Sequence, residues 1–157
     1  HLPAYYNHLP TDKGYYKEPG TYEKPGRDYV FASTEPLWAF GHGLSYTNFD
    51  YLNAVVDKEL YKAHDTIRVT VTLKNSGKRT GKEVVHVVSS VLTPVKQLKG
   101  FVKTELQAGE TKEVIIKIPV HELYLIDELG NRYLELGEFE VQVGTASDCI
   151  SFNLPVY

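Results

Sequence analysis

Side chains that could do chemistry are scattered along this sequence. Its 157 residues include 20 carboxylates, six histidines and one cysteine. General acid–base catalysis would need carboxyl groups held together in a pocket. Glu138 and Glu140 instead share the polar face of one expected strand, and Asp127 and Glu128 fall in an expected turn. Because charged carboxylates are rarely buried without a partner, we expect these groups to be solvated or locally hydrogen-bonded.

The histidines and glycines show neither a metal-binding nor a phosphate-binding pattern. The six histidines, at positions 1, 8, 42, 64, 86 and 121, include no short-spaced ligand pair, so we expect no metal site. Gly41-His42-Gly43 is not a phosphate loop, because Tyr46 stands where the dinucleotide motif has its third glycine and no helix follows. We expect these glycines to allow close backbone approach or a positive φ angle at a domain junction.

Two potential nucleophiles lack the context of a catalytic residue. Ser45 is not part of a Gly-x-Ser-x-Gly nucleophile elbow. Cys149 has no Cys/His signature nearby, and it alternates with Ile150, Phe152 and Leu154, so we expect it to face away from them. Both are interpreted as structural, and Cys149 as a free thiol.

The aromatic residues are concentrated in an uncharged stretch, residues 36–47. Its rings, Trp38, Phe40 and Tyr46, could stack on a sugar or pack between domains, and the uncharged linker composition favours packing. The candidate interdomain contacts are Trp38, Phe40, His42 and Tyr46. We expect this stretch to lie against the following domain with one of its rings partly buried. Its other side would leave apolar surface in contact with water, which costs about 25 cal/mol of free energy for each Å².

The chain after residue 46 is expected to fold as strands. Ile67, Val69, Val71 and Leu73 alternate with polar residues, and Asn75-Ser76-Gly77 ends this run as a turn. Similar patterns predict seven strands at residues 49–56, 67–74, 83–91, 100–106, 114–118, 139–143 and 150–154, with a short strand or turn at 123–126. The expected fold is all-β, an immunoglobulin-like antiparallel β-sandwich of about seven strands.

Residues 1–35 differ from the rest in composition. Pro and Gly punctuate them repeatedly, and six of the twelve tyrosines lie there. An irregular, extended segment is expected, with tyrosines that pack on another domain. The expected division is a linker region, residues 1–46, followed by a sandwich domain, residues 47–157.

Charge and hydropathy limit the classes of partner. A net charge of −3 argues against nucleic acid and against an anionic membrane, which both attract basic surfaces. No apolar run approaches the roughly 18 residues of a membrane-spanning helix. No signal-peptide pattern begins the chain, which in a fragment says nothing about where the longer protein goes.

Several motifs, in order, resemble those of glycoside hydrolase family 3, the β-glucosidases and β-xylosidases. Residues 36–47 (PLWAFGHGLSYT) resemble the signature that closes the family's second α/β domain. Residues 94–101 (PVKQLKGF), 106–110 (LQAGE) and 137–144 (GEFEVQVG) resemble elements of its C-terminal fibronectin type III-like domain. Residues 81–85 (GKEVV) match a further element, although His86 and Val88 replace the common Gln and Tyr.

The resemblance implies a C-terminal accessory domain without catalytic residues. The family's retaining hydrolysis uses two carboxyl groups about 5 Å apart. The nucleophilic Asp belongs to its first domain and the acid/base to an upstream part of the second, and neither motif matches a position here. We therefore expect no catalytic residue, no cofactor and no activity in the isolated chain.

The resemblance also points to partners. They would be the missing N-terminal catalytic domains of a parent enzyme, and a second copy of the chain where those domains are absent. A periplasmic or secreted location suits such a parent. A carbohydrate-binding β-sandwich is the alternative, which a flat row of exposed aromatic rings on one sheet face would favour. The family motifs argue against a third possibility, a fibronectin-type adhesion module.

Overall fold

The structure is a computed structural model that describes residues 37–90, 97–126, 129–134, 137, 139–147 and 149–157. Its strands are β1 (Phe49–Val56), β2 (Thr66–Asn75), β3 (Gly81–Ser90), β4 (Gln97–Leu106), β5 (Thr111–Pro119), β6 (Leu125–Ile126), β7 (Arg132–Tyr133), β8 (Phe139–Ala146) and β9 (Cys149–Val156). A single 3₁₀ turn, η1 (Val120–Leu123), follows β5. The described residues form no α-helix, and none of their helices could span a membrane.

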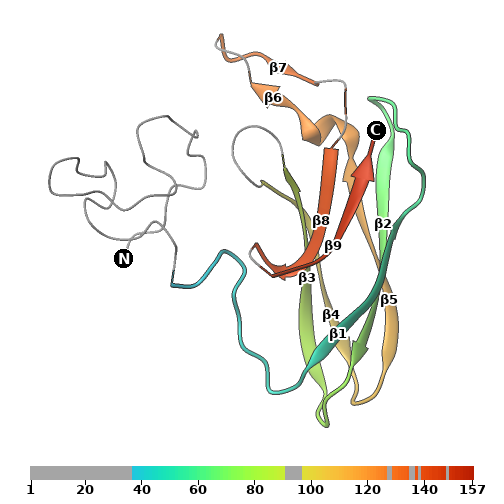
Figure 1. Cartoon of the computed structure of the whole chain (residues 1–157), viewed down its shortest axis with the longest axis vertical. Coiled ribbons are helices and arrows are strands. Elements are labelled where there is room, and N and C mark those ends of the chain that lie inside the picture. Colours follow the sequence, from blue (N-terminus) through green and yellow to red (C-terminus); the bar gives the residue numbers. More distant parts are fainter. Residues whose placement is uncertain (1–36, 91–96, 127–128, 135–136, 138, 148) are drawn as a thin grey trace, which may run out of the picture.

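Seven of the strands form two facing antiparallel sheets. One sheet has the order β1-β2-β5 and the other the order β4-β3-β8-β9, while β6 and β7 pair as a separate hairpin (Figure 1). This arrangement confirms the predicted all-β sandwich. The division of the chain at residue 46 stays a prediction.

The core between the sheets follows from the period-two patterns. The inward residues of β2, namely Ile67, Val69, Val71 and Leu73, are fully buried. They meet Val85 and Val87 of β3 and Val141 and Val143 of β8 in one apolar cluster. Because the side-chain period is two, a slip of one residue would turn each set to solvent, so the burial fixes the register. Cys149 is exposed while Ile150 is half-buried, which confirms the predicted alternation.

The structure differs from the predicted elements at several strand ends and around residues 123–126. Strand β4 begins at Gln97 rather than at Gly100, because Gln97 and Leu98 pair with β3. The segment 123–126 proves to be the end of η1 followed by β6, whose partner β7 was not predicted. The predictions for residues 1–35, Asp127, Glu128 and Glu138 lie outside the described residues.

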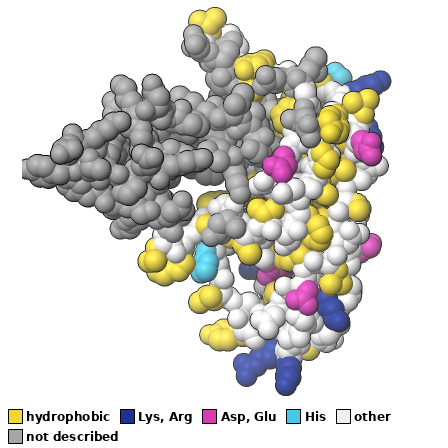
Figure 2. Space-filling view, in the orientation of Figure 1, with side chains coloured by type: hydrophobic (Ala, Val, Ile, Leu, Met, Phe, Trp, Pro, Cys, Tyr) yellow, Lys and Arg dark blue, Asp and Glu magenta, His cyan; other side chains and the backbone are white. Residues whose placement is uncertain are grey.

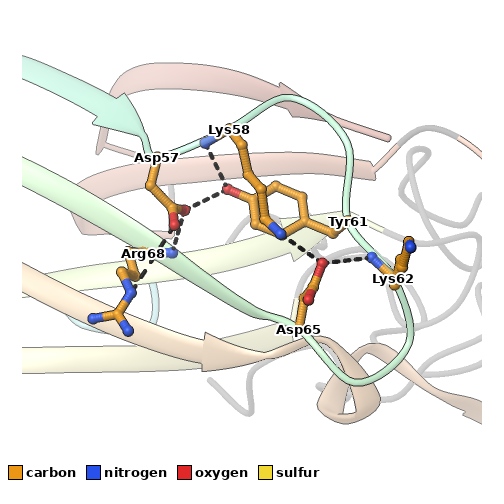
Figure 3. Close-up of polar contacts among 6 residues, drawn as sticks. All are labelled: Asp57, Lys58, Tyr61, Lys62, Asp65 and Arg68. Atoms are coloured by element: carbon orange, nitrogen blue, oxygen red, sulfur yellow. Dashed lines mark hydrogen bonds and ion pairs between the residues drawn. The ribbon is translucent and has the colours of Figure 1, made fainter.

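Two carboxylates organise the loop between β1 and β2 (Figure 3). Asp57 Oδ1 accepts hydrogen bonds from the Tyr61 hydroxyl at 2.6 Å and the Arg68 amide at 2.9 Å. Asp65 Oδ2 accepts from Lys58 Nζ at 2.6 Å and from the Lys62 amide at 2.9 Å. Desolvation alone would raise the pKa of Asp57, but its hydrogen bonds to Tyr61 and Arg68 outweigh desolvation and hold that pKa below its usual range.

The same loop holds the end of the chain. The Tyr61 amide donates to the Tyr157 carbonyl at 2.7 Å, and the Tyr157 amide donates to the Glu59 carbonyl at 2.9 Å. The loop therefore secures the last residue of the chain, which follows directly after β9.

Val69→Asp is expected to unfold the sandwich or nearly so. Val69 is fully buried in the central strand of the three-stranded sheet, and an unpaired carboxylate there lowers the free energy of unfolding by more than about 4 kcal/mol. Urea denaturation measures the loss. Thr70→Asp, one residue along on the outer face, is the matched control. An equal or larger loss for the control would refute the register.

Asp57→Asn is expected to weaken the dependence of the free energy of unfolding on pH in the acid range. A carboxylate with a lowered folded-state pKa stabilises the fold above its unfolded pKa of about 3.9 and loses that effect as pH falls through the folded value. The Asp57 carboxylate is partly solvated, so the substitution should lower the free energy of unfolding at pH 7 by roughly 0.5 kcal/mol. Urea midpoints at pH 7 and pH 3 measure it, with Glu59→Gln as the control. Equal pH dependence in the two variants would contradict the assignment.

Candidate interdomain surface

The segment 37–46 joins the sandwich through Thr47, which is buried against Asn75. Thr47 Oγ1 donates a hydrogen bond to Asn75 Oδ1 at 2.7 Å. Gly77 is required beside them, because a Cβ at this position would clash with Thr47 Oγ1. The Gly77 amide donates to the same Asn75 Oδ1 at 3.1 Å. One end of the segment is therefore fixed in both position and direction.

A second attachment holds the middle of the segment against β3 and the turn between β8 and β9. The Ser147 amide donates to the Phe40 carbonyl at 2.8 Å. Gly41 has a φ of 89°, and a Cβ there would lie 3.2 Å from both Ala146 Cα and His86 Cε1. Only glycine adopts this backbone readily and allows so close an approach. The predicted positive φ angle and close backbone approach are confirmed at Gly41.

Between and beyond these attachments, the apolar side chains of the segment point into solvent. Tyr46 is 93% exposed, Trp38 66% and Phe40 54%, and Leu37 and Leu44 are also exposed. The Trp38 and His42 rings lie 6.4 Å apart. Figure 2 shows apolar side chains projecting along the left edge of the described surface, where this segment runs in Figure 1. We call the side chains of this segment the junction surface.

The junction surface continues onto the outer face of the four-stranded sheet. The Phe40 ring meets His86 edge-on at 6.4 Å. His86 pairs across the strands with Phe101, whose side chain is exposed. His86 Nδ1 lies 2.9 Å from the Thr145 carbonyl, which can only accept, so Nδ1 carries the proton in this bond. That bond fixes the ring between the two phenylalanines.

The sequence analysis identified Trp38, Phe40, His42 and Tyr46 as one group, and all four lie in the segment. Of the three rings, Phe40 is the one that the sandwich half covers, while Tyr46 stands clear of it. His86 and Phe101 were not predicted as part of this surface. They stand in or beside family motifs of the sequence, but only the strand register brings them together beside Phe40. Whether these residues contact another domain stays a prediction.

Among the described residues, no three His, Cys, Asp or Glu side chains come close enough to hold a metal ion. The Tyr51 hydroxyl donates to Glu83 Oε1 at 3.0 Å between β1 and β3. Burial raises the pKa of Glu83, and the hydrogen bond from Tyr51 offsets only part of that rise. This pair joins the two sheets.

The chain is similar in sequence to part of several glycosidases. Residues 84–147 match the family described as fibronectin type III-like domain. The chain is 41% identical over 127 residues to thermostable beta-glucosidase B of Acetivibrio thermocellus and 39% identical over 124 residues to a beta-xylosidase of Formosa agariphila. These matches cover 77% and 76% of this chain and 17% of each relative.

A solved structure agrees over a longer stretch. The beta-glucosidase of Listeria innocua in complex with glucose is 34% identical and superposes with a TM-score of 0.77. The match covers 98% of this chain and 22% of that enzyme. This chain therefore spans less than a quarter of the length of each of these three proteins.

Thr47→Val is expected to loosen the attachment of the segment. It removes one buried hydrogen bond while nearly keeping the volume, so the free energy of unfolding falls by about 1 kcal/mol. Thr47→Ser keeps the hydroxyl and controls for the methyl group beside Gly81. Urea denaturation of both variants gives the comparison. A Val variant as stable as the wild type would show that the hydroxyl contributes nothing.

Proposed function

We propose that this chain packs against the α/β domains of its parent enzyme through the junction surface. The premise is that the chain is the C-terminal portion of a glycoside hydrolase family 3 enzyme, with its fibronectin type III-like domain. The chain is an accessory domain. Its role would be to support the catalytic domains and hold them in place. The parent would hydrolyse β-glucosides or β-xylosides by the retaining mechanism, with both catalytic carboxyl groups outside this chain.

The carrying observation is a rigidly held backbone that exposes apolar side chains. Thr47 and Gly41 fix the backbone of the segment 37–46 at two points. The apolar side chains of the segment nevertheless remain exposed. Clustered apolar side chains of this kind mark interaction sites on soluble proteins. A surface that is already ordered loses little conformational entropy when a partner covers it.

The alternative, carbohydrate binding on a sheet face, has less support. Among the described residues of the two large sheets, the strongly exposed aromatic side chain is Phe101. One ring does not make the flat row that a polysaccharide would need. Three further exposed rings, Trp38, Phe40 and Tyr46, lie together in the segment 37–46, while Tyr133 and Tyr157 lie outside both large sheets. The grouping in the segment favours contact with a neighbouring domain.

Trp38→Ser tests the proposal when it is made both in the full-length enzyme and in this chain alone. In the chain alone, Trp38 is largely exposed, so the free energy of unfolding should change by less than about 0.5 kcal/mol. In the full-length enzyme, the loss of a buried Trp should lower it by about 3 kcal/mol. Chemical denaturation measures both values.

Self-association of the isolated chain through the same surface would complicate this comparison. Light scattering over a concentration series identifies the range in which the chain is monomeric, and the chain is measured there. The same small change in both proteins would contradict the proposal, because Trp38 would then be as exposed in the enzyme as in the chain.

A further inference from the structure

We propose that the β6–β7 hairpin is a second docking arm, which contacts the same α/β domains as the junction surface. The hairpin leaves the sandwich after η1 and pairs only Leu125 with Tyr133 and Ile126 with Arg132. It forms a sheet of its own, outside both layers of the sandwich. The inference rests on the proposed function, since it takes the remainder of the enzyme as the occupant.

The hairpin is held firmly at its base. Tyr124, directly before β6, has Arg132 Cζ 4.3 Å from its ring centroid and Lys99 Nζ 5.7 Å from it. Such cation–π contacts strengthen when they are partly removed from water. Lys99 also donates a hydrogen bond to the Glu122 carbonyl in η1. Strand β4, η1 and β7 are therefore joined around one aromatic ring.

This base is connected with the junction surface through strand β4. Lys99, which contacts Tyr124, lies two residues before Phe101 on that strand. A Cβ at Gly100 would meet Ile116 of the opposite sheet, so Gly100 faces inward and the exposed Phe101 faces outward. Phe101 pairs with His86, and the His86 ring meets the Phe40 ring edge-on. One strand therefore connects the base of the hairpin with the residues that contact the segment 37–46.

The tip of the hairpin carries an apolar side chain far from the core. Leu129 is 87% exposed, and the half-exposed Tyr133 follows on β7. Figure 1 shows the hairpin above the sandwich with its tip at the upper left and the segment 37–46 at the lower left, and Figure 2 shows an apolar side chain over the hairpin tip. A firmly held arm with an apolar tip is suited to contact with a protein partner.

The length of the relatives indicates which domains would contact the hairpin. The matching region covers only 17% to 22% of the relatives compared above, so most of such an enzyme lies outside this chain. The described chain begins, at residue 37, on the side toward which the hairpin projects. Domains that precede residue 37 and cover the junction surface would lie on that same side.

Hydrogen exchange read by mass spectrometry compares this chain with the full-length enzyme. Amides of residues 129–133 are expected to exchange at least about tenfold more slowly in the full-length enzyme, because docking suppresses local opening. Slower exchange at 37–46 but not at 129–133 would overturn the docking arm and leave the proposed function standing. No slowing in either segment would overturn both.

A matched pair of substitutions supplies the second measurement. Leu129→Asp places a charge at the hairpin tip, and Leu60→Asp places one on a similarly exposed leucine, 70% accessible, in the loop between β1 and β2. In the full-length enzyme, Leu129→Asp should lower the thermal midpoint and Leu60→Asp should leave it unchanged. In this chain alone, both midpoints should match the wild type. Equal midpoints for the two variants in the full-length enzyme would refute the docking arm.

Discussion

The buried amide of Asn75 is the interaction on which the arrangement of this domain depends. Its Nδ2 donates to the Arg79 and Leu106 carbonyls at 2.8 and 3.1 Å, while its Oδ1 accepts from Thr47 and Gly77. Its backbone amide donates to the Glu110 carbonyl, and its carbonyl accepts from Gly109. A polar side chain fully out of water is tolerated only when its hydrogen bonds are satisfied, and all of these are.

Those six bonds connect elements from both sheets at one end of the sandwich. They join the start of β1, the turn into β3, the end of β4 and the turn into β5. The segment 37–46 ends at Thr47, so its direction is set by the same network. A junction that sets the angle between domains must resist rotation, and a satisfied polar network does this better than apolar contacts, which allow sliding. The Gly41 contact then removes the remaining freedom of the segment.

The strands could be predicted from the sequence because one face of each is buried. The alternation from Ile67 to Leu73 determines both the element and its inward face. The role of Asn75 could not be predicted in this way. Its neighbours Ser76 and Gly77 indicate a turn, which is correct, but the partners of its side chain lie as many as 31 residues away. Which carbonyls a buried amide meets depends on how the two sheets stack.

The candidate surface could likewise be predicted only where its residues are close in the sequence. Trp38, Phe40, His42 and Tyr46 were predicted because they lie close together in one uncharged stretch of the sequence. His86 and Phe101 were not found, since a single histidine in a strand and a single aromatic residue are common on any sheet. The β6–β7 hairpin was missed for a related reason. Its strands have two residues each, too few for a periodic pattern, and its base is formed by Lys99, Tyr124 and Arg132 from separate elements.

The two outer faces of the sandwich differ, and the difference gives the domain a direction. On the three-stranded sheet, Val55 and Ile115 are exposed in a row with Thr70, and Glu113 and Lys117 flank Ile115 along β5. A narrow apolar row between charges is ordinary for a solvated sheet face. On the four-stranded sheet, Phe101 and His86 form a row with Phe40 of the segment 37–46, and Lys99 of β4 contacts Tyr124 at the base of the hairpin. Both projecting elements therefore contact strands of this sheet. A large neighbouring domain would cover the sandwich on that side, and the three-stranded sheet would remain in contact with water.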